Sequence, residues 1–255
     1  MASHPPGPCC TVGTLYEGEP QGESIKIGNG KIDAYLAKPP ADKALTGCGI
    51  IFLPDVIGIW QNSKLLADNF AAAGYPTLLV DLFDGDPVPL NRPASYDLMK
   101  WLRQGSDGKT PHTKEAVDPI TLAGIAALRE MGVAHIAAVG YCFGAKYAIR
   151  HYKSGIECAF VAHPSFVDDE ELAALSGPLS IAAAEEDFIF STEKRHQSEE
   201  ILKKTGQPYQ VNLYSGVVHG FAVRGKIEVQ VERFAKEQAF RQALIWLQEF
   251  LPREG

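Results

Sequence analysis

The stretch Ala138-Val139-Gly140-Tyr141-Cys142-Phe143-Gly144-Ala145 decides the fold class. An apolar, strand-like run ends here in Gly-x-Cys-x-Gly, and a helix-like run follows it. Because the flanking glycines have no Cβ, a strand and a helix can crowd together while the central side chain projects above the sheet. A helix start also favours negative charge on sulfur. The motif predicts a nucleophile elbow built on Cys142, with a buried structural cysteine at a glycine-rich turn as the alternative.

Short apolar runs without internal proline recur on both sides of the elbow, as is typical of buried parallel strands. They occupy 48–54, 75–81, 134–140, 158–163, 178–184 and 208–214. Segments with helical spacing lie between or after them, at 63–73, 119–131, 145–152, 192–205 and 231–250. Two earlier runs, 24–27 and 31–37, flank Gly28-Asn29-Gly30, a turn typical of a β-hairpin. We therefore expect an α/β fold with an about eight-stranded, mostly parallel sheet, an antiparallel N-terminal hairpin and helices on both faces.

The length of 255 residues and the 45% hydrophobic content suit one large core. We predict a flexible leader over residues 1–23, rich in Pro and Gly, and a single domain over residues 24–255. The stretch 84–118 carries several prolines and interrupts the strand–helix rhythm. It is interpreted as a cap-like insertion, with a solvated connector as the alternative.

Charge and hydropathy narrow the partners. The chain has 31 acidic and 24 basic side chains and a formal net charge of -7, which opposes binding to nucleic acid or to anionic membranes. The start of the chain lacks the pattern of a secretory signal, and no apolar run approaches the ~20 residues that cross a bilayer. We expect a cytoplasmic protein, monomeric or homodimeric, whose partner is a small molecule.

The five cysteines are an odd set without a CxxC pair, which argues against a disulfide framework and a structural zinc site. We accordingly expect no metal and no cofactor. Cys48 and Cys158 lie in or next to apolar runs and are interpreted as buried hydrophobic residues. A metal or redox role for the vicinal pair Cys9 and Cys10 stays an open alternative.

A cysteine nucleophile needs a base and an acid, which in this architecture follow it in the order acid, then histidine. His219 follows the last strand-like run, where a histidine at the top of the sheet belongs, and His163 is its rival. Asp187 follows the run at 178–184 and is the predicted acid, because a short carboxylate can orient the imidazole and stabilise its cation. Glu186 is the alternative acid.

On these residues the chain resembles the dienelactone hydrolase family of α/β-hydrolases, also described as carboxymethylenebutenolidase-like, and in particular its eukaryotic branch. The matching segments are Gly-Tyr-Cys-Phe-Gly at 140–144, Glu-Asp-Phe at 186–188 and Val-His-Gly-Phe at 218–221. The resemblance extends over nearly the whole chain.

The resemblance implies further roles. A carboxylate in the loop after the first parallel strand holds the resting thiol in this family, and Asp55 stands there in place of the usual Glu. The backbone N–H groups of Phe143 and Val56 would form the oxyanion hole. Bacterial members hold a substrate carboxylate with two arginines; here one position is acidic, and the other has Arg224 displaced by one residue. A dianionic dienelactone would therefore meet repulsion.

Aromatic residues near the predicted top of the sheet indicate a broad apolar pocket. With Arg224, the predicted pocket residues are Trp60, Phe83, Phe188 and Phe221. The expected function is a cysteine-dependent hydrolase that opens a lactone or an activated ester through a thioester acyl-enzyme. The alternative is a non-catalytic α/β-hydrolase scaffold that binds a small molecule or a protein partner. A redox-sensitive Cys142 is a third hypothesis.

Overall fold

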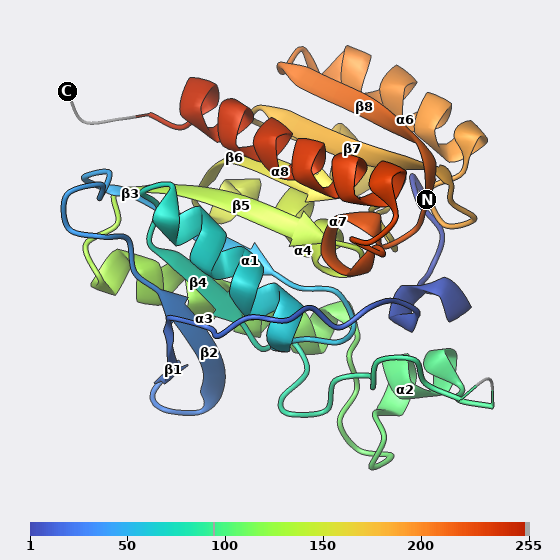
Figure 1. Cartoon of the computed structure of the whole chain (residues 1–255), viewed down its shortest axis with the longest axis horizontal. Helices are drawn as coiled ribbons and strands as arrows, with labels where there is room; N and C mark the ends of the chain where they lie inside the picture. The colour runs from blue at the N-terminus through green and yellow to red at the C-terminus, as the bar shows by residue number, and fades with distance from the viewer. Residues whose placement is uncertain (94, 253–255) are drawn as a thin grey trace.

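The centre of the molecule is an eight-stranded sheet, seen in a computed structural model that describes residues 1–93 and 95–252 (Figure 1). Ala94, in the predicted insertion, and the last three residues of the predicted domain lie outside the described residues. The strand order is β1-β2-β4-β3-β5-β6-β7-β8. The strands are β1 (Glu23–Ile27), β2 (Ile32–Ala37), β3 (Cys48–Leu53), β4 (Thr77–Val80), β5 (His135–Tyr141), β6 (Ile156–Ala162), β7 (Leu179–Glu186) and β8 (Tyr209–Val218).

Pairing directions confirm the predicted fold class. β1 and β2 form an antiparallel hairpin, and β2 pairs antiparallel with β4. Every other pairing, from β4 through β3 and β5 to β8, is parallel. The hairpin turn has positive φ at Gly28, Asn29 and Gly30, as its residue types predict. An antiparallel edge therefore leads into a parallel sheet.

Helices cover both faces of the sheet. The face toward the viewer in Figure 1 carries α1 (Gln61–Ala72), α7 (Phe221–Arg224) and α8 (Gln230–Phe250). The other face carries α3 (Lys114–Glu130), α4 (Gly144–Arg150), α5 (Asp169–Ala173) and α6 (Thr192–Thr205). A short helix, α2 (Leu98–Gln104), and two 3-10 turns, η1 (Pro8–Thr11) and η2 (Tyr152–Ser154), complete the elements of the described residues.

Alternate side chains of the central strands build two separate cores. On β3, Ile51 and Leu53 belong to the core beneath α3 and α4, whereas Ile50 and Phe52 belong to the core beneath α1 and α8. All four side chains are fully buried. Because both faces of the strand are covered, β3 is apolar throughout instead of alternating apolar and polar residues. The central strands are therefore fixed from both sides, and the residues at their carboxyl ends are held with them.

Three helices differ from the sequence-based expectation. α3 begins at Lys114, five residues before the expected start at Pro119, and its first two residues, Lys114 and Glu115, are charged and exposed, so apolar periodicity does not mark its start. α5 and α7 are too short to show helical periodicity at all. None of the helices of the described residues is long and apolar enough to span a membrane.

The segment at 84–118 lies beside the sheet and holds α2, which packs through the buried ring of Trp101. Two backbone hydrogen bonds tie it to the rest of the chain: Val88 N–H donates to Val56 C=O at 2.8 Å, and Asn91 N–H donates to Thr11 C=O at 2.7 Å. The segment thus abuts one loop at the carboxyl edge of the sheet and the N-terminal part of the chain.

The N-terminal residues 1–16, here called the strap, run over the carboxyl edge of the sheet (Figure 1). Ser3 and His4 donate backbone hydrogen bonds to the carbonyl groups of Val167 and Ile189, at 3.1 and 2.8 Å. Thr14 N–H donates to the carbonyl of Arg224 at 3.0 Å. Residues expected to form a flexible leader are therefore anchored at both ends, and within the strap the side chains of Ala2, Ser3, Cys10 and Thr11 are buried.

Candidate active site

The elbow between β5 and α4 holds Cys142 in a left-handed backbone conformation, with φ of 51°. A Cβ at Gly140 would lie 2.7 Å from the Cα of Ala145, and a Cβ at Gly144 would overlap the carbonyl group of Leu53. Only glycine fits at either position, because the backbones pack closer than side chains allow. The cysteine side chain is therefore the group that this turn presents at the carboxyl edge of the sheet.

Asp187 and His219 follow the carboxyl ends of β7 and β8 and form a buried pair. The carboxylate Oδ2 of Asp187 lies 2.8 Å from Nδ1 of His219. Its Oδ1 accepts hydrogen bonds from the backbone N–H groups of Ile189 and Phe190, at 2.8 and 3.0 Å. Glu186, the alternative acid, is exposed to solvent. The pair fixes the imidazole so that Nε2 faces away from the carboxylate.

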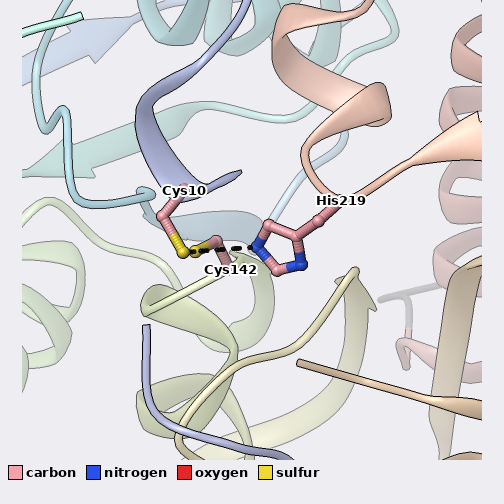
Figure 2. A group of neighbouring side chains, drawn as sticks. All are labelled: Cys10, Cys142 and His219. Carbon is pink, nitrogen blue, oxygen red and sulfur yellow. Dashed lines mark hydrogen bonds between the residues drawn. The ribbon is translucent and has the colours of Figure 1, made fainter. Parts of the chain in front are cut away.

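Two sulfur atoms and the imidazole meet at the centre of the site (Figure 2). The Sγ of Cys10, carried by the strap, lies 3.4 Å from the Sγ of Cys142 and 3.7 Å from Nε2 of His219. The hydroxyl of Ser165 lies 3.6 Å from the Cys142 sulfur on another side. Cys10 and Cys142 have no exposed surface, and His219 has almost none.

Electrostatics favour a thiolate and an imidazolium. Burial alone would raise the pKa of Cys142, but the contact with Cys10 and the charge of His219 outweigh burial and hold that pKa well below its usual value. Burial would lower the pKa of His219, yet the charges of Asp187 and Cys142 raise it to about 10. Burial, followed by the neighbouring Cys142, raises the pKa of Cys10. At neutral pH the site therefore holds one thiolate, one imidazolium and one neutral thiol.

The two predicted oxyanion donors belong to loops that touch. Val56 follows β3 and Phe143 follows Cys142, and both residues are fully buried. The N–H of Gly144 donates to the carbonyl of Pro54 at 3.0 Å, which ties the elbow to the loop after β3. The structure thus places the backbone of both residues at the same edge of the sheet as the elbow sulfur.

Asp55, predicted as the partner of the resting thiol, is engaged elsewhere. Its Oδ2 forms a buried ion pair with Nη1 of Arg224, and its Oδ1 accepts a hydrogen bond from Ile57 N–H at 3.1 Å. The same guanidinium donates to the carbonyl groups of Val12 and Cys9, at 3.1 and 3.4 Å. Arg224, predicted as a pocket residue, therefore clamps the strap to the loop after β3.

The predicted aromatic pocket residues separate into two groups. Phe83 and Phe221 are buried; Phe83 packs against the rings of Phe143 and Trp101, and Phe221 belongs to the core beneath α1 and α8. Trp60 is half-buried at the start of α1. Phe188 is 90% exposed and lies in the wall of a surface hollow. Of these four aromatic rings, only that of Phe188 lines the hollow beside the acid–histidine pair.

The hollow has a volume of about 720 Å³ and opens beside the acid–histidine pair. Its lining combines apolar side chains with carboxylates and includes neither Cys142 nor a residue of the 84–118 segment. The lining residues are Cys9, Val12, Glu185, Glu186, Asp187, Phe188, Ser191, Thr192, Glu193, Val218 and His219. The strap thus separates the hollow from the elbow sulfur.

Two neighbours of the site, Cys10 and Ser165, were not predicted as site residues from the sequence. The sequence indicates Cys10 only as half of a vicinal pair with an open metal or redox role, because no local pattern shows that the strap folds back over the elbow. Ser165 follows β6 in a segment without a motif. His163, considered as a rival base, is fully buried with its ring 5.0 Å from that of His219, and neither of its ring nitrogens has a hydrogen-bond partner among the described residues.

The sheet, the elbow and the acid–histidine pair define an α/β-hydrolase. The model of the dienelactone hydrolase family matches residues 32–251, and the chain belongs to that family. It is 46% identical to the protein named hydrolase pyvD of Aspergillus violaceofuscus, covering 99% of this chain and 100% of that relative. It is 24% identical to the human carboxymethylenebutenolidase homolog, covering 96% of this chain and 98% of the relative.

These fungal and mammalian relatives agree with the predicted eukaryotic branch. Among solved structures, the dienelactone hydrolase from Anabaena variabilis shares the fold with a TM-score of 0.63 and 13% identity, over 92% of this chain and all of that one. At such low identity the likeness shows the fold alone. The protein is a hydrolase of the dienelactone hydrolase family.

Proposed function

We propose that the protein hydrolyses a neutral lactone or activated ester through a thioester on Cys142. The observation that carries the proposal is the buried series Asp187, His219 and Cys142. The carboxylate of Asp187 lies 2.8 Å from Nδ1 of His219. The donor nitrogen of His219 and the Sγ of Cys142 lie within 4.8 Å of each other. This is the geometry of an acid, a base and a nucleophile on three different strand ends.

The residues divide the reaction into two acyl transfers. The Cys142 thiolate attacks the carbonyl carbon, and the negative charge passes to the carbonyl oxygen, which the N–H groups of Val56 and Phe143 stabilise. The C–O bond then breaks, and the imidazolium of His219 gives its proton to the leaving oxygen. In the second step His219 takes a proton from water, the resulting hydroxide attacks the thioester, and the acid leaves as the thiolate returns.

Charges around the hollow support a neutral substrate. Within the described residues its lining holds the carboxylates of Glu185, Glu186 and Glu193 and no lysine or arginine. Arg224, the one arginine predicted for the pocket, forms a buried ion pair with Asp55 instead. A substrate carboxylate would meet like charges here. The exposed ring of Phe188 offers an apolar surface for the acyl or alcohol portion.

Access to the sulfur requires a movement of the strap. The hollow reaches His219 and Asp187, but Cys142 lies behind Cys9 and Cys10. The turn that carries these cysteines is held by the Arg224 hydrogen bonds to Val12 and Cys9. We infer that substrate enters as this turn shifts outward.

The test is the acyl-enzyme itself. Full-length protein, reduced and treated with a chelator, is mixed with a neutral aryl ester and quenched for intact-mass analysis. We expect a mass increase equal to the acyl group on Cys142, and its absence in Cys142→Ala. Cys9→Ala is the matched control and retains the adduct. Turnover unchanged in Cys142→Ala would overturn the mechanism, and ester binding without adduct or product would support a binding scaffold instead.

A second measurement addresses the substrate class. The neutral ester and an analogue with carboxylates on its acyl group are compared by kcat/KM. We expect the neutral ester to be favoured by at least about tenfold, because like charges line the hollow. Glu186→Gln and Glu193→Gln together should narrow this ratio. A preference for the carboxylated analogue would contradict the proposed class.

A further inference from the structure

The cluster in Figure 2 contains one group that the proposed hydrolysis does not use, the thiol of Cys10. An acyl transfer needs one nucleophile and one base, and Cys142 and His219 supply them. Cys10 is nevertheless fully buried between the two, and its sulfur approaches both donor atoms. The strap therefore adds a third soft donor to a dyad that is complete without it.

Two of the three separations between the donor atoms are close to the edges of a tetrahedral metal site. With Zn–S bonds of ~2.3 Å and Zn–N bonds of ~2.0 Å, a tetrahedral zinc ion places two sulfur ligands ~3.8 Å apart and a sulfur and a nitrogen ligand ~3.5 Å apart. The observed separations are 3.4 Å between the two Sγ atoms and 3.7 Å between Cys10 Sγ and His219 Nε2. All three atoms lie within 4.8 Å of one another.

The surroundings of the imidazole also suit a metal ligand. Asp187 engages Nδ1 of His219, so Nε2 is the nitrogen that faces the sulfur atoms. Metal-binding histidines typically make this contact with a carboxylate, because it fixes the ring and makes the other nitrogen a better donor. Asp187 is itself held by the N–H groups of Ile189 and Phe190. The ligand geometry is therefore supported before any ion arrives.

Cys10, the ligand that the strap carries, is held in place by the hydrogen bonds of the strap. The backbone of the strap is bonded at His4 on one side of Cys10 and at Thr14 on the other. Arg224 binds the carbonyl groups of Cys9 and Val12, directly around the Cys10 turn. A ligand fixed in this way loses little conformational freedom when it binds an ion.

We propose that Cys10, Cys142 and His219 are the protein ligands of a binding site for a soft divalent cation, and that this cation is Zn²⁺. Two Zn–S bonds and one Zn–N bond form, the protons that these groups carry pass to solvent, and water takes the fourth position. Since the ion occupies both the nucleophile and the base, the loaded protein does not hydrolyse esters through the Cys142 thioester. This last statement rests on the proposed function, whereas the binding itself does not.

Binding is measured without reference to activity. Reduced, chelator-treated full-length protein is dialysed against Zn²⁺ and analysed for metal, and a parallel titration with Co²⁺ is followed by thiolate-to-metal charge-transfer absorption. We expect one ion per chain. Because even partners of metal ligands contribute about 10–100-fold to affinity, Cys10→Ser should weaken binding by at least about 100-fold and reduce the charge-transfer intensity.

Cys9→Ser is the matched control, since Cys9 is the adjacent thiol and does not belong to the cluster. It should retain the affinity and the charge-transfer intensity of the unchanged protein. Cys10→Ala provides a second variant of the same position if the serine variant does not fold. Less than one tightly bound ion per chain, or equal binding by the unchanged protein and the Cys10 variants, would overturn the site.

Inhibition separates this proposal from the proposed function. Stoichiometric Zn²⁺ should abolish ester hydrolysis by the unchanged protein, and chelator should restore it, whereas Cys10→Ser should require at least about tenfold more Zn²⁺. If the protein binds one ion through Cys10 but never forms an acyl-enzyme, the hydrolase proposal fails and the metal site stands. If the protein hydrolyses esters but does not bind Zn²⁺, the metal site fails and the hydrolase proposal stands.

Discussion

The Sγ atoms of Cys10 and Cys142 lie 3.4 Å apart, although 132 positions separate the two residues in the chain. The strap brings a second thiol to the elbow and covers it, so the reactivity of Cys142 depends on a segment outside the catalytic sheet.

Peroxide should join Cys10 to Cys142. One hydrogen peroxide oxidises the two thiols, a disulfide forms and two water molecules leave; the sulfur atoms need to approach from 3.4 Å to about 2.05 Å. In metal-free protein we expect loss of hydrolysis that a thiol reductant reverses, with the linked peptides found by mass spectrometry. Cys9→Ser should still form the link and Cys10→Ser should not. A Cys9–Cys142 link would contradict this geometry.

Asp187→Asn should lower kcat by about a thousandfold or more, because the amide no longer orients the imidazole or stabilises its cation. Glu186→Gln changes the neighbouring, exposed carboxyl group and should leave kcat for a neutral ester within about twofold. Steady-state hydrolysis of one neutral aryl ester measures both variants. An effect of Glu186→Gln as large as that of Asp187→Asn would move the acid to the alternative residue.

Asp55→Asn should destabilise the protein by about 3–5 kcal/mol, because it leaves the buried guanidinium of Arg224 without its counter-charge. Urea unfolding above neutral pH measures the change. The control is Asp33→Asn, which breaks the exposed Lys26–Asp33 pair and should cost no more than about 1 kcal/mol. A double variant, Asp55→Asn with Arg224→Met, should recover part of the loss. Equal losses for the buried and exposed pairs would show that the clamp contributes no stability.

The pH dependence follows from the thiolate–imidazolium pair in metal-free protein. Since the pKa of Cys142 is held well below its usual value, its thiolate is present at neutral pH and is lost only on stronger acidification. The ultraviolet difference between the unchanged protein and Cys142→Ser should show that thiolate at neutral pH. In His219→Asn the thiolate should appear only at a higher pH than in the unchanged protein, because one of the causes that lower the pKa of Cys142 is removed.

The basic limb tests the other partner of the same pair. Asp187 and Cys142 raise the pKa of His219 to about 10 against the effect of burial. The imidazolium that protonates the leaving oxygen is therefore present below that pH, and kcat/KM should fall as the pH rises through it. A fall near the ordinary histidine pKa of about 6.5 would contradict the assigned charges.

Most of the fold was predictable because sequence patterns a few residues long determine it. The central strands, β3 to β7, are short and mainly apolar runs, and the elbow needs Gly140 and Gly144 because a strand meets a helix so closely there. Parallel strands place their carboxyl ends at one edge, so the order of Cys142, Asp187 and His219 along the chain already predicted that they meet. The structure places all three at that edge.

Contacts between residues that lie far apart in the sequence were not predictable in the same way. Arg224 was interpreted as a pocket residue from its position near His219, but its direction is set by Asp55 and by the strap carbonyls, which no local pattern contains. From their positions in the sequence, Phe83 and Phe221 were expected near the carboxyl edge of the sheet and in the pocket. In the structure their side chains are packed in the two cores. An aromatic side chain indicates an apolar neighbourhood without indicating which side of the backbone it occupies.

The amino-acid sequence by itself determined the α/β-hydrolase sheet, the elbow and the identity of its acid, base and sulfur candidates, because backbone sterics and strand periodicity act over a few residues. Only the tertiary structure decided that the N-terminal strap lies over this elbow and that Cys10 touches its sulfur. The path of the strap depends on hydrogen bonds to Val167, Ile189 and Arg224, groups that come together only after the sheet has folded.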